Sequence, residues 1–76
     1  MKNASEIVTK VLKDLGVENA SVTERIKEDC GLDSLSLVSV IVGLEEELGG
    51  EFDDADLDPA ELITVENLIT LTEKYL

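Results

Sequence analysis

Apolar residues recur at helical spacing near the start of the chain, and the flanking residues suit helix ends. Asn3 with Glu6 three residues later matches a capping pair, and Gly16 is a typical residue to end a helix. The pattern therefore predicts a first helix over about residues 4–15. Its apolar face consists of Ile7, Val8, Val11, Leu12 and Leu15.

The stretch from Ser34 to Leu48 predicts a second helix, which differs from the first because it has two apolar faces. On a helical wheel at about 100° per residue, a core face lies almost opposite a second apolar stripe. The core face consists of Leu37, Val40, Ile41, Leu44 and Leu48. The stripe consists of Leu35, Val38 and Val42, with Glu45 on one border. A polar gap on the other border holds Ser36, Ser39, Gly43, Glu46 and Glu47.

Stop and start signals organise the rest of the chain. Gly49 and Gly50 end the second helix, and Phe52 is the expected apolar anchor of the loop that follows. The run Asp58-Pro59-Ala60-Glu61 predicts a short third helix ending near Ile63. Thr64 then caps a fourth helix. Its shared face consists of Val65, Leu68, Ile69, Thr72 and Tyr75.

Residues 17–33 show no sustained period, and we expect a long structured loop there with Val22 and Ile26 directed toward the core. Strand-like alternation is absent from the sequence. We therefore predict a single all-α domain over residues 1–76, a four-helix bundle with three longer helices and a short third helix.

Charge is distributed unevenly along the chain, whose six basic and eighteen acidic residues give a net charge of −12. Residues 31–63 carry ten acidic groups and no basic group. Such a surface repels nucleic acid and anionic membranes and attracts basic patches on partner proteins. The alternative is that these acids only keep a small protein soluble.

Other features of the sequence indicate the cellular compartment in which we expect the protein. No apolar run is long enough for a signal peptide or a membrane span. The single Cys30 has no partner for an internal disulfide and suits a reducing compartment. A small buried apolar role for Cys30 is favoured over a reactive one. We expect a cytoplasmic monomer.

The stripe of Leu35, Val38 and Val42 has two interpretations. A helix in so small a protein cannot easily bury both faces, so the stripe is expected at the surface, edged by acids, as a partner-docking site. Alternatively, the loop at 17–33 covers it.

The run Asp29-Cys30-Gly31-Leu32-Asp33-Ser34-Leu35 leads straight into the second helix. Ser34 would lie in the first turn, where free backbone N–H groups and the helix dipole favour a negatively charged phosphate ester. Asp33 or Ser34 could instead be an ordinary N-cap.

This run and the helix after it resemble the prosthetic-group site and second helix of acyl carrier proteins. The resemblance rests on Gly-Leu-Asp-Ser-Leu at 31–35, the apolar helix ending in three glutamates, and the late Thr64-Val65-Glu66-Asn67-Leu68 helix start. It extends over nearly the whole chain and includes its length, acidity and helix order.

The resemblance implies that 4′-phosphopantetheine from coenzyme A is attached to Ser34 by a phosphopantetheinyl transferase. Asp33 matches the acid that helps to hold the magnesium ion of that transferase. Leu35, Val38 and Val42 match exposed recognition positions. Glu45 and Glu46 match acids that meet basic residues on partner enzymes.

The cargo in this family is an acyl or aminoacyl group held as a thioester at the thiol of the arm. The resemblance makes Leu44, Phe52 and Ile63 candidates to line a pocket for long acyl chains. Expected partners are acyl- or aminoacyl-activating ligases or transferases, and synthases with basic docking patches. The chain has no histidine and Ser34 has no neighbouring base, so we expect a carrier without catalytic or metal-binding residues.

Some positions depart from carriers of bulk fatty-acid synthesis. Ser36 and Ser39 stand where acids are usual, Leu37 is more apolar than usual, and residues 56–61 lengthen the last connection. These departures weaken an assignment to bulk fatty-acid synthesis, and the Leu57-Asp58-Pro59 form is more similar to carriers of secondary metabolism or aminoacyl transfer. A carrier of fatty-acid or polyketide synthesis and an aminoacyl or peptidyl carrier both remain open.

A different class is suggested by Asp54, Asp56 and Asp58, whose spacing imitates the start of a calcium-binding loop. The imitation then fails, because Pro59 stands where glycine is required and Val65 where the bidentate glutamate belongs.

Overall fold

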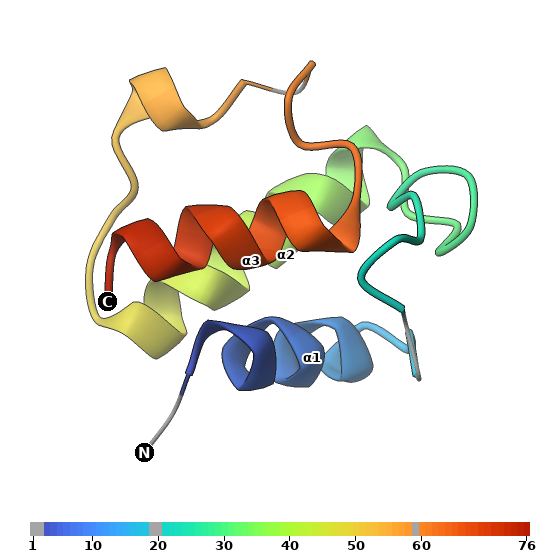
Figure 1. Cartoon of the computed structure of the whole chain (residues 1–76), viewed down its shortest axis with the longest axis horizontal. Coiled ribbons are helices and arrows are strands. Elements are labelled where there is room, and N and C mark those ends of the chain that lie inside the picture. Colours follow the sequence, from blue (N-terminus) through green and yellow to red (C-terminus); the bar gives the residue numbers. More distant parts are fainter. Residues whose placement is uncertain (1–2, 19–20, 59) are drawn as a thin grey trace.

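Three α-helices dominate the computed structural model, which describes residues 3–18, 21–58 and 60–76. They are α1 (Ala4–Asp14), α2 (Ser34–Leu48) and α3 (Val65–Lys74). Helix α1 packs against both other helices, and Figure 1 shows it below α3, with α2 behind α3. The all-α prediction is confirmed, and the bounds of the three longer helices agree with the sequence pattern to within a residue or two.

The helix starts follow their capping residues. The Asn3 side chain accepts a hydrogen bond of 2.9 Å from the Glu6 N–H at the start of α1. At the start of α3, Thr64 and Asn67 form a reciprocal capping box. Each cap satisfies N–H groups that have no partner within the helix.

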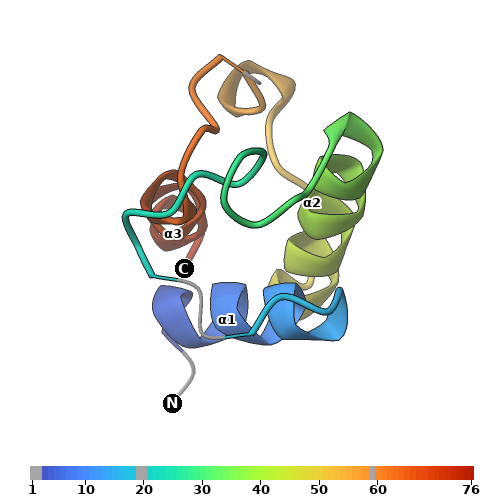
Figure 2. The same ribbon diagram turned by 90° about the vertical axis from the view of Figure 1, so that its right-hand side faces the viewer.

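The loop before α2 fills the side of the bundle opposite α1, between α2 and α3 (Figure 2). Ile26 and Leu32 are 2% and 7% exposed, so this loop supplies part of the core in place of a helix. Val22 is 46% exposed, so its predicted core position is wrong. The Ile26 N–H donates to the Ile63 carbonyl at 2.8 Å and fastens the loop to the segment before α3.

The predicted short third helix is a single turn in the described residues. The N–H groups of Glu61 and Leu62 both donate to the Asp58 carbonyl, at 2.9 and 3.1 Å. The Asp58 side chain accepts from the Ala60 N–H at 2.9 Å, so the capping geometry forms. The helix stops because the Ile63 carbonyl and N–H bond instead to the 17–33 loop and to Asn67. Pro59 lies outside the described residues.

A 3₁₀ helix, η1 (Asp54–Asp56), occupies the segment that was predicted as loop. The described fold is therefore three α-helices with one 3₁₀ turn, not four helices. None of these helices is both long enough and apolar enough to span a bilayer.

The core is aliphatic, with Leu12, Leu44 and Leu68 almost fully buried at 1%, 0% and 0% exposure. Phe52 is buried, as its predicted anchoring role requires, and packs edge-on against Tyr75 with ring centroids 4.8 Å apart. Phe52 thereby holds the segment after α2 against the end of α3.

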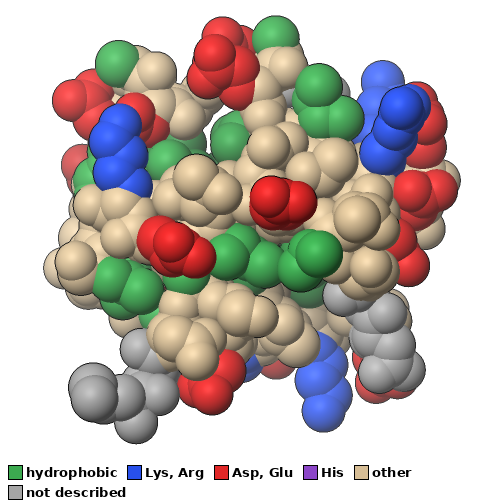
Figure 3. Space-filling view, in the orientation of Figure 1, with side chains coloured by type: hydrophobic (Ala, Val, Ile, Leu, Met, Phe, Trp, Pro, Cys, Tyr) green, Lys and Arg blue, Asp and Glu red, His purple; other side chains and the backbone are tan. Residues whose placement is uncertain are grey.

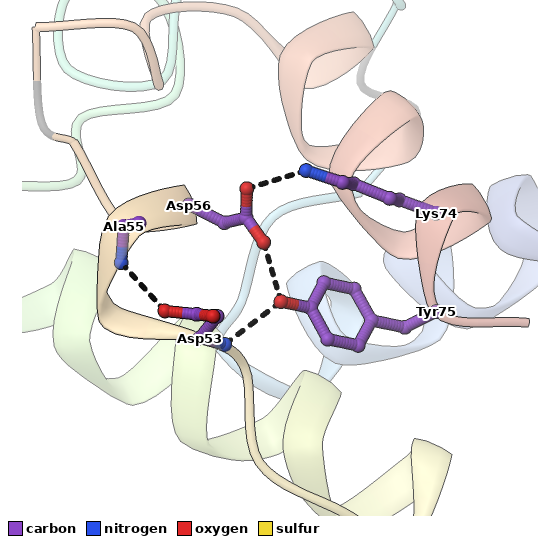
Figure 4. Close-up of polar contacts among 5 residues, drawn as sticks. All are labelled: Asp53, Ala55, Asp56, Lys74 and Tyr75. Carbon is purple, nitrogen blue, oxygen red and sulfur yellow. Dashed lines mark hydrogen bonds and ion pairs between the residues drawn. The ribbon is translucent and has the colours of Figure 1, made fainter.

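A polar cluster reinforces this attachment (Figure 4). Asp56 accepts hydrogen bonds from Lys74 Nζ at 2.6 Å and from the Tyr75 hydroxyl, and these contacts hold the pKa of Asp56 below its usual value. The Tyr75 oxygen accepts from the Asp53 N–H at 2.8 Å. Both Asp56 oxygens therefore point to α3, which is not the arrangement of a calcium-binding loop.

Candidate functional site

Asp33 is the N-cap of α2, and Ser34 is the first residue of the helix. The Asp33 carboxylate accepts a hydrogen bond of 2.9 Å from the Ser36 N–H. This bond is the main reason that the pKa of Asp33 is lowered from its usual value. Asp33 is therefore the residue that caps the helix, and Ser34 does not serve as the cap.

The residues before Asp33 fix the direction from which the chain enters α2. Gly31 has φ 72°, a left-handed conformation that is strained for residues with a side chain. Leu32 is buried, and its N–H donates to the Ile26 carbonyl at 3.1 Å. The turn at Gly31 and the anchor at Leu32 together fix the path by which the backbone enters α2 at Ser34.

The surroundings of Ser34 fit a phosphate ester. The first turn of α2 contains no acidic residue, and the positive end of a 15-residue helix favours an anion there. A surface cavity of about 250 Å³ lies beside Asp33 and has two basic residues, Arg25 and Lys27, and two acidic residues, Glu28 and Asp33, in its lining. Arg25 is ion-paired with Glu28 at 3.0 Å. Both basic residues belong to the 17–33 loop, outside the acidic segment.

The second apolar stripe of α2 is exposed. Leu35, Val38 and Val42 are 79%, 59% and 46% exposed, so the 17–33 loop does not cover them. Glu46 is exposed beside the stripe. Glu45 is half-buried, and its carboxylate accepts a hydrogen bond from the Phe52 N–H at 2.9 Å. This bond holds the loop after α2 against the helix.

The opposite border of α2 meets α1, although the sequence placed a polar gap there. A Cβ on Gly43 would lie 2.9 Å from Val11 Cγ1, so the two helices approach closely at this glycine. Glu47 forms an ion pair with Lys10 of α1. The wheel identified these positions but could not show that α1 packs on them.

The three candidates for an acyl pocket do not come together. Leu44 and Phe52 are members of the buried core, whereas Ile63 is 50% exposed. Ile63 lines the cavity beside Asp33 and also a cavity of about 510 Å³ between α3 and the segment before it. Figure 3 shows the surface hollowed near this second position, with basic side chains at the margins of the view.

A third cavity, of about 290 Å³, runs along α2, and two residues of the exposed stripe form part of its lining. It is lined by Leu37, Val38, Ile41, Val42, Glu45, Leu57 and Leu62. The sequence does not predict that Leu62 lines a cavity, because a single leucine in a short expected helix forms no pattern that indicates its neighbours.

Cys30 is half-buried and packs against the core. Burial raises the pKa of its thiol, and the nearby Glu24 carboxylate, 3.8 Å from the sulfur, adds to the effect. The thiol is therefore protonated near neutral pH, when it is a poor nucleophile.

Comparison with known proteins gives two findings. The family model described as "Phosphopantetheine attachment site" matches residues 5–72. A curated protein of Thermotoga maritima named "Acyl carrier protein" is 39% identical over 82 aligned positions, which include 100% of this chain and 99% of the relative.

Proposed function

This chain belongs to the acyl carrier protein family, and we propose that Ser34 is the residue to which its 4′-phosphopantetheine is attached. The observation that carries the proposal is the position of Ser34 as the first residue of α2, with the cap supplied by Asp33. The thiol of the arm supplies the thioester that holds the cargo. The residues of the chain position the arm and present it to partners.

We assign the partner surface to the exposed stripe of α2. Leu35, Val38 and Val42 give an apolar centre, and Glu46 gives a charged border. Burial of such a stripe against a partner contributes free energy, while the acidic segment at 31–63 speeds encounter with basic surfaces. The partners that this surface suits are those of acyl carrier proteins in general, namely phosphopantetheinyl transferases and synthases.

The cargo is an acyl group of fatty-acid or polyketide type, with an aminoacyl or peptidyl group as the second candidate. Ser36 and Ser39 favour clients other than enzymes that require acids at these two positions. The chain has no histidine, so acyl transfer depends on residues of the partner enzymes.

Attachment at Ser34 is tested by incubating the purified protein with coenzyme A, magnesium and a broad-specificity phosphopantetheinyl transferase. We expect the intact mass to increase by one phosphopantetheine unit, and Ser34→Ala to remove the increase completely. Ser36→Ala is the matched control, because it changes a serine two residues later in the same helix and should still be loaded. Loading of Ser34→Ala would falsify the assignment.

A further inference from the structure

Two glutamates, Glu45 and Glu46, border the exposed stripe of α2 from opposite sides. Adjacent residues of a helix point about 100° apart, so the two side chains meet different neighbours. Glu46 is exposed, and within residues 3–18, 21–58 and 60–76 its carboxylate has no hydrogen bond or ion pair. Glu45 is half-buried and bonds to the chain itself. One of the two acids is therefore free to meet a partner, and the other is already in use.

The Glu45 carboxylate holds the start of the segment that follows α2. It accepts the Phe52 N–H at 2.9 Å, across seven positions of the chain. Phe52 is only 6% exposed, and loss of the acceptor would leave a donor with little access to water. A shielded donor without a partner costs more than a hydrogen bond lost between exposed groups. The bond from Glu45 is therefore a structural attachment of this segment to α2.

Helix α3 holds the same segment from the other side (Figure 4). The Tyr75 oxygen accepts from the Asp53 N–H at 2.8 Å, and Lys74 Nζ donates to Asp56 at 2.6 Å. Residues 52–57 therefore form a bridge between α2 and α3, which we call the 52–57 bridge. Without its attachment to α2, this bridge would keep its polar contacts with α3 alone.

The 52–57 bridge carries an apolar side chain to the border of the exposed stripe. Leu57 is half-buried, packs against the core, and lines the cavity along α2 together with Val38 and Val42 of the stripe. Glu45 lines the same cavity. The position of Leu57 beside the stripe thus depends on how the bridge is attached to α2.

We propose that Glu45 is a positioning residue, which holds the 52–57 bridge and its Leu57 beside the exposed stripe, and that Glu46 supplies the charge that basic groups of a partner contact. The part that concerns partners rests on the proposed function. A partner cation at Glu45 would have to share a half-buried carboxylate with the Phe52 N–H, whereas an ion pair with Glu46 displaces no bond of the described chain. An acceptor oxygen is therefore required at 45, and a negative charge is required at 46.

The attachment is tested by amide hydrogen exchange of the full chain, measured by NMR. Glu45→Ala should speed exchange of the Phe52 amide about tenfold or more relative to the Leu71 amide of α3, which corrects for any change in global stability. Glu45→Gln keeps an acceptor oxygen and should restore most of the protection. Glu46→Ala is the matched control, because it shortens the adjacent glutamate, and should leave the ratio unchanged. Both alanine variants should fold, because alanine is the strongest helix former.

The division of roles is tested by loading, with kcat/KM of a phosphopantetheinyl transferase measured at low and high salt. Glu46→Gln should lower kcat/KM about threefold at low salt and much less at high salt, because salt screens an exposed ion pair. Glu45→Gln should leave it nearly unchanged. Glu45→Ala should lower it about twofold at both salt concentrations, because this loss comes from displaced apolar surface at Leu57.

The outcomes separate this inference from the proposed function. If the unchanged protein gains no mass on loading, attachment at Ser34 is overturned and the division of charge with it, while hydrogen exchange still tests the attachment of the bridge. An unchanged ratio of Phe52 to Leu71 exchange in Glu45→Ala overturns the positioning role. Equal and salt-sensitive losses in kcat/KM from Glu45→Gln and Glu46→Gln overturn the division of charge.

Discussion

The two apolar faces of α2 use the same kinds of residue for opposite purposes. Val40 and Leu44 on one face are fully buried, whereas Leu35 and Val38 on the other are 79% and 59% exposed. Both faces lie on one 15-residue helix and consist of leucine and valine, with one isoleucine, Ile41, on the core face. Composition alone therefore cannot assign them, and their roles depend on what packs against each face.

Burial makes the first face part of the stability of the fold, since each buried side chain removes apolar surface from water. The second face remains exposed to water in the free protein. It therefore contributes free energy only when a partner binds and buries it. A change on the first face should therefore alter unfolding, and a change on the second should alter partner kinetics.

The largest expected effect is on the buried face. Leu44→Ala should lower the free energy of unfolding by about 2–5 kcal/mol, because it removes a fully buried side chain and leaves a cavity. Leu35→Ala, on the opposite face, should change it by no more than about 0.5 kcal/mol. Urea denaturation followed by circular dichroism measures both values. Equal losses from the two variants would contradict the distinction between the faces.

A smaller effect is expected where α2 meets α1. Gly43→Ala places a Cβ 2.9 Å from Val11 Cγ1, and Val11 is buried with a β-branched side chain that has few other rotamers. Overpacking costs about 1–3 kcal/mol, against a gain of about 1 kcal/mol from replacing a helical glycine. We expect a net loss of about 1 kcal/mol in the free energy of unfolding.

The matched test at this contact is a double-mutant cycle with Val11→Ala, which removes the atom that Gly43→Ala approaches. In that background Gly43→Ala should be neutral or stabilising. A loss of the same size in both backgrounds would show that the close approach is not its cause.

The parts of the molecule that depend on local pattern could be predicted from the sequence. The three longer helices, their caps and the exposed stripe follow from periodicity within α1, α2 and α3. The short helix after Asp58 was mispredicted because long-range bonds from Ile63 to the loop compete with helical ones. That Leu37 and Leu62 line the same two cavities could not be predicted, because the two residues are 25 positions apart and only tertiary packing brings them together.

The smallest effect concerns the exposed face, and two valines of equal exposure isolate it. Val42 in the stripe and Val22 in the loop are each 46% exposed, so their replacement by alanine removes similar surface. Val42→Ala removes two methyl groups, about half of whose surface a partner could bury. We therefore expect it to reduce kcat/KM of a phosphopantetheinyl transferase about fourfold.

Val22→Ala should leave the same kcat/KM unchanged, because Val22 lies off α2, on the loop that is fastened to α3. Steady-state loading with labelled coenzyme A measures both variants, and their free energies of unfolding show whether stability differs between them. Equal reductions in kcat/KM would mean that the transferase responds to the loss of any exposed apolar surface, on the loop as much as on α2. A reduction confined to Val42→Ala ties recognition to the exposed face of α2, because the two variants differ in position and not in the surface removed.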